Sequence, residues 1–106
     1  MLDSTHPLSR LAWTPRLLKR AQYEAFEFSL VDGDVRVRNA SHADPAAHEY
    51  RVHIENEQPV ACTCPFDIRA DTACKHRIAV AIRPEILDAA TTMQTLTDAR
   101  SRPPLE

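Results

Sequence analysis

The chain has 106 residues and a formal net charge of −2, with 13 Lys and Arg against 15 Asp and Glu. This length predicts one small domain, and a content of 43% hydrophobic and 26% charged residues is typical of a globular protein. The one glycine, Gly33, excludes P-loops and dinucleotide-binding loops, because both need several positions without a Cβ. Nucleic-acid binding would have to come from a local basic patch, since the chain has no overall positive charge.

The sequence predicts neither a signal peptide nor a membrane span. Residues 1–10 lack the apolar core of a signal peptide, and no apolar run approaches the roughly 18 residues of a membrane span. We therefore expect a cytoplasmic protein without a membrane partner. In such a reducing compartment, three cysteines placed close together indicate metal binding rather than disulfides.

The N-terminal half predicts a helix followed by a sheet. Thr14 can cap a helix that begins at Pro15, where the missing N–H is no loss. After that helix the apolar residues recur with a period of two, which is typical of half-buried strands. The predicted elements are a β-hairpin over residues 24–39 that turns at Asp32-Gly33-Asp34, a loop over 40–47, a third strand with Tyr50, Val52 and Ile54 inward, and a short fourth strand from Val60 to Cys64.

The C-terminal half predicts two helices. We expect residues 65–73 to be irregular, a helix from Cys74 to Ile82, and a second helix from Pro84, with a frayed tail from about Arg100. The first of these helices is expected to pack onto the sheet through Ile78, Ala81 and Ile82. The fold class is therefore α+β. Its parts are an N-terminal helical extension over 1–23, a hairpin and third strand over 24–58, a cysteine-containing unit over 59–83 and a C-terminal helix with its tail over 84–106.

Four potential metal ligands follow one another in the pattern C-x-C-x9-C-x-H. They are Cys62, Cys64, Cys74 and His76, the set that a tetrahedral structural zinc ion requires. Cys62 and Cys64 lie two apart on an extended segment, so both thiols leave the same side of the backbone. Residues two apart within a regular helix point about 200° apart, so Cys74 must lie at or just before the start of the helix that carries His76.

This pattern resembles the SWIM zinc finger, and the flanking Cys64-Pro65 and Cys74-Lys75-His76-Arg77 segments resemble that family as well. The resemblance covers residues 59–83 and implies a ββα zinc unit, one structural Zn²⁺ and a role in DNA binding or protein–protein contact. The preceding strands resemble the N-terminal part of small stand-alone archaeal SWIM proteins. Within these 106 residues no transposase, ATPase or kinase domain accompanies the finger, so the resemblance leaves its target open.

Basic residues in two places are candidate contacts for nucleic acid or a protein partner. Near the finger these are Arg69, Lys75 and Arg77, of which the last two could instead neutralise the thiolates. On the outward face of the predicted sheet they are Arg36, Arg38 and Arg51. A solvated strand face is the alternative for this second group.

Three functions are open to the sequence. The first is a nucleic-acid-binding protein, with DNA as the expected target, and the second is a protein-interaction adaptor with a purely structural zinc ion. Catalysis is not expected, and neither is a small-molecule substrate, because four protein ligands leave no open position on zinc. His42 and His48 could hold a second metal or belong to loop structure. Phe66, beside the finger, is a candidate for contact with a ligand.

Overall fold

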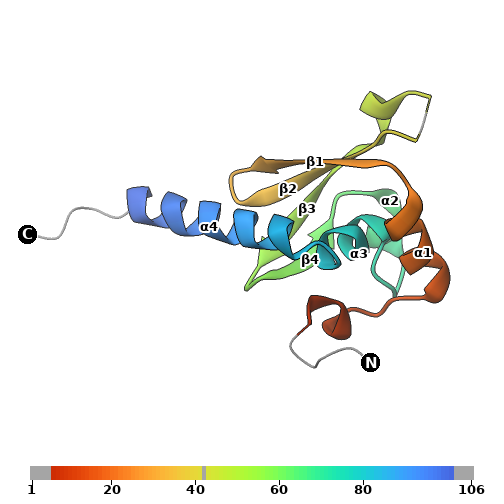
Figure 1. The fold of residues 1–106 in the computed structure, drawn as a ribbon, viewed down its shortest axis with the longest axis horizontal. Helices are drawn as coiled ribbons and strands as arrows, with labels where there is room; N and C mark the ends of the chain where they lie inside the picture. The colour runs from red at the N-terminus through yellow and green to blue at the C-terminus, as the bar shows by residue number, and fades with distance from the viewer. Residues whose placement is uncertain (1–5, 42, 102–106) are drawn as a thin grey trace, which may run out of the picture.

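A computed structural model describes residues 6–41 and 43–101, with side chains up to residue 96. Four antiparallel strands form one sheet in the order β1-β2-β3-β4, so that each strand pairs with its sequence neighbours (Figure 1). The strands are β1 (Phe26–Val31), β2 (Asp34–Asn39), β3 (Glu49–Glu55) and β4 (Gln58–Cys62); the helices are α1 (Pro15–Tyr23), α2 (Pro65–Arg69), α3 (Lys75–Ala81) and α4 (Pro84–Ser101), with 3₁₀ helices η1 (Pro7–Arg10) and η2 (Pro45–His48). The α+β class expected from the sequence is confirmed.

The predicted β1–β2 hairpin turns at Asp32 and Gly33, which both have positive φ, at 52° and 86°. Such angles belong to the tight turns that match the twist of paired strands. A Cβ at position 33 would collide with the side chain of Gln94 in α4. The Gln94 amide donates to the carbonyl of Gly33 at 2.9 Å and to that of Ile54 at 2.6 Å. One side chain therefore ties α4 to the hairpin turn and to β3.

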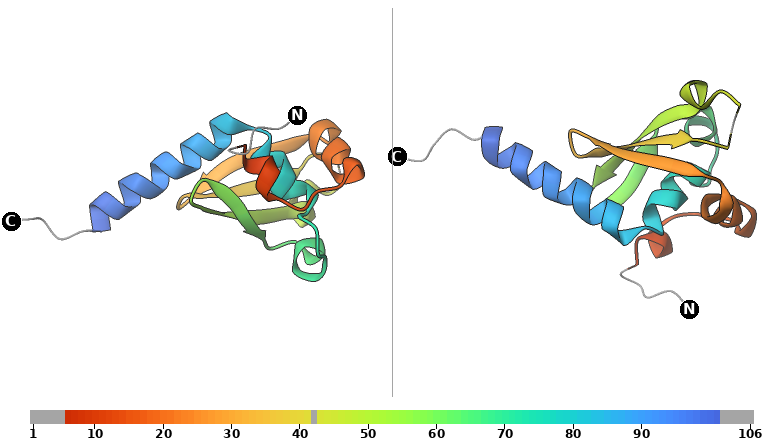
Figure 2. Two further views of the ribbon diagram at one scale, coloured as in Figure 1. Left: turned by 90° about the horizontal axis from the view of Figure 1, so that it is seen from below. Right: turned by 45° about the horizontal axis from the view of Figure 1, so that its top comes forward.

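The main core lies between one face of the sheet and the helices that cover it (Figure 2). Four inward side chains of β2 and β3 are at most 1% exposed, as the period of two predicted, and Tyr50 is partly buried; the four are Val35, Val37, Val52 and Ile54. Val80 of α3 and Leu87 and Ala90 of α4 pack against them. All three cysteines belong to the same cluster. The candidate metal centre is therefore part of the core.

A second apolar cluster joins α1 to α3. Thr14 caps α1 as expected, with its hydroxyl accepting from the Leu17 N–H at 3.2 Å. Ala21 of α1 and Leu8 of η1 are buried against Ile78 and Ala81 of α3. Ile78 and Ala81 were expected to pack onto the sheet. They pack mainly against η1 and α1 instead, because these N-terminal helices cover that side of α3.

Two further boundaries differ from the sequence prediction. The fourth strand begins at Gln58 and ends at Cys62, and residues 65–69, expected to be irregular, form α2. Cys64 caps this short helix, Pro65 occupies its first turn and an acid follows at Asp67, which together are ordinary helix-start signals. A segment can therefore be helical without apolar periodicity when its capping residues are strong.

Helix α4 runs along the sheet and projects past it (Figures 1 and 2). It begins at Pro84, as predicted, and continues through Ser101, so the fraying expected from Arg100 does not start there. The rest of the expected tail, residues 102–106, lies outside the described residues. Among the helices that are described, none combines the length and apolarity needed to cross a membrane.

Candidate metal centre

The structure brings the four predicted ligands together at the junction of β4, α2 and α3. Cys62 is the last residue of β4, and Cys64 and Cys74 are the capping residues of α2 and α3. His76 lies in the first turn of α3, which begins at Lys75. The requirement that Cys74 precede the helix is therefore met.

The geometry of this cluster suits a tetrahedral ion. The four donor atoms all lie within 4.8 Å of one another, and Cys62 Sγ lies 3.8 Å from His76 Nδ1. Zn–S bonds of about 2.3 Å and Zn–N bonds of about 2.0–2.1 Å place tetrahedral ligands about 3.5–3.8 Å apart. Each ligand residue is at most 6% exposed. These four residues fit one structural zinc ion, and three thiolates with neutral His76 would leave the centre with a charge of −1.

The cysteine thiols are strongly coupled because they lie so close together. Hydrogen bonding to the Cys64 sulfur raises the pKa of Cys62 to about 12, and hydrogen bonding to Cys62 raises the pKa of Cys74. The same contacts lower the pKa of Cys64, since its thiolate accepts from both neighbours. A divalent metal that binds this cluster displaces the protons that its thiols carry.

Backbone donors support two of the sulfurs. The N–H of Asp67 points to Cys64 Sγ at 3.4 Å, and the N–H of Arg77 points to Cys74 Sγ at 3.5 Å. Each sulfur thus accepts at the N-terminal end of a helix, where a thiolate is favoured. Both helices begin at a ligand, so the two helix starts orient these sulfurs within the folded domain.

Asp67 holds the two halves of the site together, and the sequence analysis missed it. Its Oδ2 accepts from the N–H of Cys62 at 2.9 Å, and its Oδ1 accepts from the N–H of Cys74 at 3.3 Å. The guanidinium of Arg77 also donates to Oδ1 at 2.9 Å, and Arg77 Nε donates to the carbonyl of Pro59 at 2.8 Å. Partners outside the ligand shell fix ligand orientation in this way. The helix-start pattern around Pro65 was the available signal for Asp67.

Two aromatic rings pack against the imidazole of His76. The imidazole lies 5.0 Å from the Tyr50 ring and 5.8 Å from the Phe26 ring, measured between centroids. These contacts restrict the orientation of the imidazole and leave Nδ1 facing Cys62. Tyr50, on β3, thus takes part in building the metal centre.

Most of the candidate contact residues are engaged in ion pairs. Lys75 Nζ lies 2.6 Å from Glu24, and Arg77 pairs with Asp67 as described, so neither neutralises the thiolates through a direct contact. On the sheet, Arg36 and Arg38 both pair with Glu49, at 3.1 and 2.7 Å. The sixth candidate, Arg69, is exposed and makes no ion pair with a described residue.

Arg51 forms the most extensive of the sheet contacts, together with a buried aspartate. Asp34 accepts from Arg51 Nε at 2.9 Å, from the N–H of Ile54 at 3.1 Å, and contacts His53 Nδ1 at 2.9 Å. Burial alone would raise the pKa of Asp34, but these hydrogen bonds together hold it below its usual range. On the outer face of the sheet, the three candidate arginines are therefore paired with acids.

His42 and His48 were considered above as a possible second metal site. Among the described residues, the Cys62, Cys64, Cys74 and His76 group is the one cluster that brings three or more possible ligands together. His48 ends η2 and His42 lies outside the described residues.

A buried Cys₃His set between a strand and two helix starts defines a structural zinc finger. Residues 50–83 match the family model described as SWIM zinc finger, so this segment of the chain is a SWIM zinc finger. The matched range starts in β3, nine residues earlier than the sequence analysis placed it, and includes Tyr50. No curated protein and no solved structure matches the chain, so these comparisons give no support to the likeness with small stand-alone archaeal proteins.

Proposed function

We propose that the chain is a zinc-stabilised module that binds nucleic acid, with DNA as the first target to test. The observation that carries this proposal is an uneven charge distribution. Residues 14–24, which contain α1, and residues 62–77, which run from the first metal ligand to the residue after the last one and include α2, contain six Lys and Arg against three Asp and Glu. The whole chain has a charge of −2, whereas this end has +3 before the metal is counted. The local positive charge at this end of the molecule favours an anionic partner.

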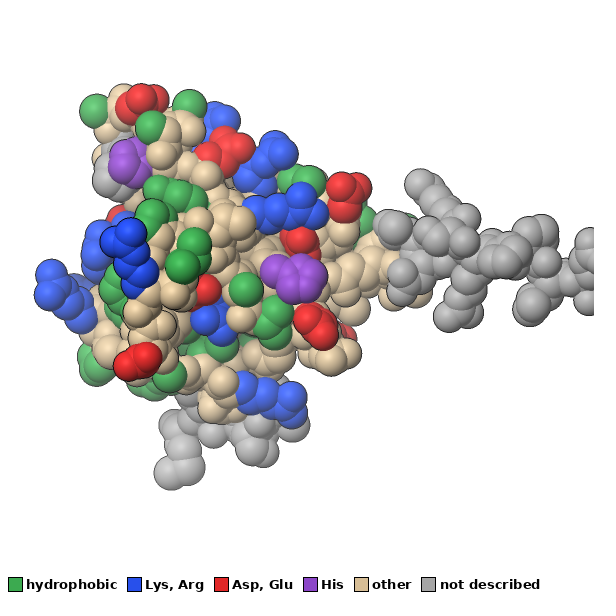
Figure 3. Space-filling model, turned by 180° about the vertical axis from the view of Figure 1, so that it is seen from behind, with side chains coloured by type: hydrophobic (Ala, Val, Ile, Leu, Met, Phe, Trp, Pro, Cys, Tyr) green, Lys and Arg blue, Asp and Glu red, His purple; other side chains and the backbone are tan. Residues whose placement is uncertain are grey.

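Several cations at this end are available to a partner. Arg16 and Lys19 lie three apart on the same face of α1, and both are exposed. Together with Arg69 of α2, they make no ion pair with a described residue. Figure 3 shows Lys and Arg side chains along the edge of the molecule opposite α4, where α1 and α2 lie. We therefore place the phosphate contacts on α1 and α2, because the arginines of the sheet are already paired with acids.

A non-catalytic role is part of the same proposal. Four protein ligands close the coordination sphere of the zinc ion, so no position remains for an activated water. The three thiols also suit a reducing compartment such as the cytoplasm.

A protein-interaction adaptor is the second candidate, and one observation favours it. Three apolar side chains near the finger are exposed: Val60 at 40%, Phe66 at 46% and Ile68 at 73%. Exposed apolar groups of this kind are common at protein contact sites. One stoichiometric protein partner that survives nuclease treatment would support this candidate.

Fluorescence anisotropy with labelled single- and double-stranded DNA and RNA, over a range of salt concentrations, tests the proposal. We expect affinity to fall steeply with salt, with a log–log slope of about 0.9 for each duplex phosphate neutralised. Replacing Arg16, Lys19 and Arg69 by Gln should flatten this slope by about 2–3. Replacing Arg36 and Arg38 by Gln is the matched control and should leave it unchanged. Absence of salt-sensitive binding to every probe would reject nucleic-acid binding.

A further inference from the structure

A cleft lies between α1 and α2, and the metal centre forms its floor, because Cys64, Cys74 and His76 line it. Its volume is about 230 Å³, smaller than the roughly 300–1,000 Å³ of sites for drug-sized molecules. Leu17 and Arg20 of α1 form one side, and Pro65 and Phe66 of α2 form the other. The space is therefore suited to one ring-sized group and not to an extended ligand.

The lining of this cleft is mainly apolar and aromatic. Phe66 is 46% exposed, and Tyr50 forms part of the inner wall beside His76. The Tyr50 hydroxyl makes no hydrogen bond with another described residue, so it is a polar group available to a ligand. A planar ring entering the cleft would meet the aromatic residues Phe66 and Tyr50.

The rim of the cleft has the charge that a phosphate backbone requires. Arg20 lies in the lining but pairs with Glu24 at 2.9 Å, whereas Arg16 and Lys19, beside it on α1, make no ion pair with a described residue. Arg69 stands in the last turn of α2, one turn beyond Phe66. Lys75 also lines the cleft, but it is 13% exposed and bonded to Glu24, so it contributes little to the open rim. Cations along a groove with an aromatic platform are the means by which proteins bind single strands.

We infer that this cleft receives one unstacked base of a single-stranded nucleic acid, which stacks on Phe66 while the flanking phosphates lie against α1 and Arg69. This inference rests on the proposed nucleic-acid binding and specifies its form. A base within a duplex is stacked on both faces and paired along one edge. It therefore cannot enter a space of this size without leaving the double helix. Single strands should therefore bind more tightly than a duplex of equal length.

The test measures anisotropy of a labelled oligothymidine of about a dozen nucleotides, and of a duplex of equal length, with the full zinc-loaded chain. We expect Phe66→Ala to weaken binding of the single strand at least about 5-fold, which is the low end of the loss of one base–aromatic stack. Binding of the duplex should change less than 2-fold (on the order of measurement error). Ile68→Ala is the matched control: it removes an exposed apolar side chain from the same helix, but Ile68 does not line the cleft.

Tyr50→Phe provides a second variant that keeps the ring and its packing. It should weaken binding of the single strand modestly, about 2- to 5-fold for loss of one hydrogen bond, and leave zinc content and thermal melting unchanged. Zinc content and melting of Phe66→Ala are measured in the same way, so that a folding defect is separated from a loss of stacking.

The outcomes separate this inference from the function on which it rests. Salt-sensitive binding that prefers the duplex, or that is equal in wild type and Phe66→Ala, overturns the base cleft and leaves nucleic-acid binding in place. No salt-sensitive binding to any probe overturns both. Polyglutamate that binds with the same dependence on Phe66, while oligothymidine does not bind, would assign the cleft to an acidic protein partner instead.

Discussion

The ammonium group of Lys75 lies 2.6 Å from the carboxylate of Glu24, across 51 positions of the sequence. The pair connects the end of α1 to the first turn of α3, next to the ligand His76. Both side chains are largely buried, at 13% and 20% exposure, and Asn39 donates to the same Glu24 oxygen at 2.7 Å. A residue that the sequence offered as a contact for phosphate therefore joins two helices around the metal centre.

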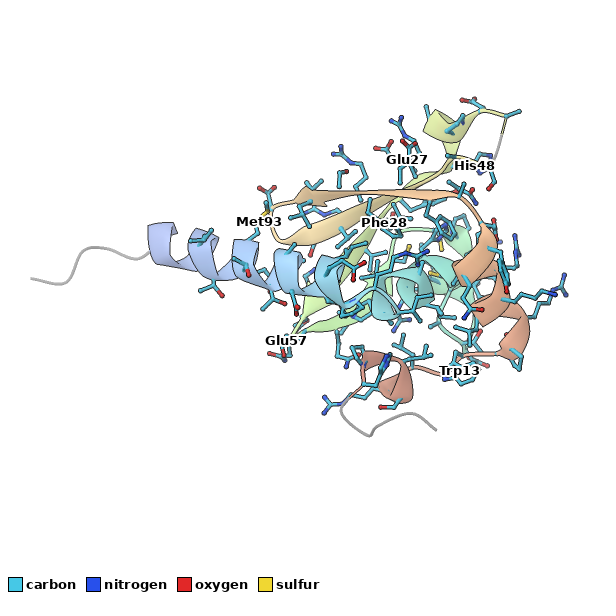
Figure 4. All side chains as sticks on the ribbon, in the orientation of Figure 1. Trp13, Glu27, Phe28, His48, Glu57 and Met93 are labelled. Atoms are coloured by element: carbon cyan, nitrogen blue, oxygen red, sulfur yellow. The ribbon has the colours of Figure 1, made fainter. Side chains whose placement is uncertain are left out.

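Removing the charge of Glu24 should destabilise the fold. We expect Glu24→Gln to lower the free energy of unfolding by about 1–3 kcal/mol at pH 7, since a charged hydrogen-bond partner of Lys75 is lost. Urea denaturation of the zinc-loaded protein measures this change in the free energy of unfolding. Glu27→Gln, an exposed position on β1 (Figure 4), is the control and should change stability by less than about 0.5 kcal/mol. Equal stability of the two variants would contradict the structural role of the pair.

The pH dependence of this effect has a definite sign. Burial alone would raise the pKa of Glu24, but hydrogen bonds from Lys75 and Asn39 together lower it. A lowered pKa in the folded protein means that the contribution is present above the ordinary glutamate pKa of about 4.3 and is lost as the pH falls. The difference between wild type and Glu24→Gln should therefore narrow as the pH approaches 4.

Asp67→Ala should weaken zinc binding although Asp67 is not a ligand. The substitution removes the acceptor for the N–H groups of Cys62 and Cys74, and outer-shell partners of this kind contribute about 10- to 100-fold in metal affinity. Competition with a chromophoric zinc chelator measures the change. Asp71→Ala removes an exposed acid that follows α2, four residues after Asp67, and should leave the affinity as it is. A similar loss in both variants would mean that loop charge, and not the Asp67 contacts, sets the affinity.

Chelation of zinc should unfold the domain. A structural zinc site supplies on the order of 10 kcal/mol or more, while a chain of this length has only a small apolar core, in which the three cysteines themselves take part. We expect EDTA at neutral pH to abolish the circular-dichroism spectrum of the fold and added zinc to restore it. A spectrum that stays unchanged after verified removal of zinc would contradict this prediction.

Glu57→Gly should stabilise the protein. Asn56 and Glu57 form the β3–β4 turn with φ of 52° and 62°, a conformation that glycine adopts without cost (Figure 4 labels Glu57 at this turn). Thermal melting of the zinc-loaded protein should show a gain of about 0.5–1 kcal/mol. Asn56→Gly is the control, because asparagine already tolerates positive φ, and it should give no comparable gain. A loss of stability in Glu57→Gly would show that the side chain has a role beyond the turn.

The ligand set and the strand pattern were predictable from sequence because both depend on short-range spacing. The two-residue separations of Cys62 from Cys64 and of Cys74 from His76 required a strand end and a helix start, and the structure has both. Alternation of apolar residues identified the inward faces of β2 and β3 for the same reason. Helix α2 was not predicted because it is short. Its sequence signals are capping residues, and it has no apolar periodicity.

The use of the charged residues was decided only by the tertiary structure. Nothing local in the sequence indicates that Lys75 meets Glu24, that Arg51 meets Asp34, or that Arg77 meets Asp67, since the partners are 51, 17 and 10 positions apart. An ion pair forms where folding brings two oppositely charged side chains within a few ångströms of each other. The spacing of the two residues in the sequence does not determine that distance. The cleft between α1 and α2 has the same origin, because α1 packs on α3, and α3 is held by its metal ligands beside α2.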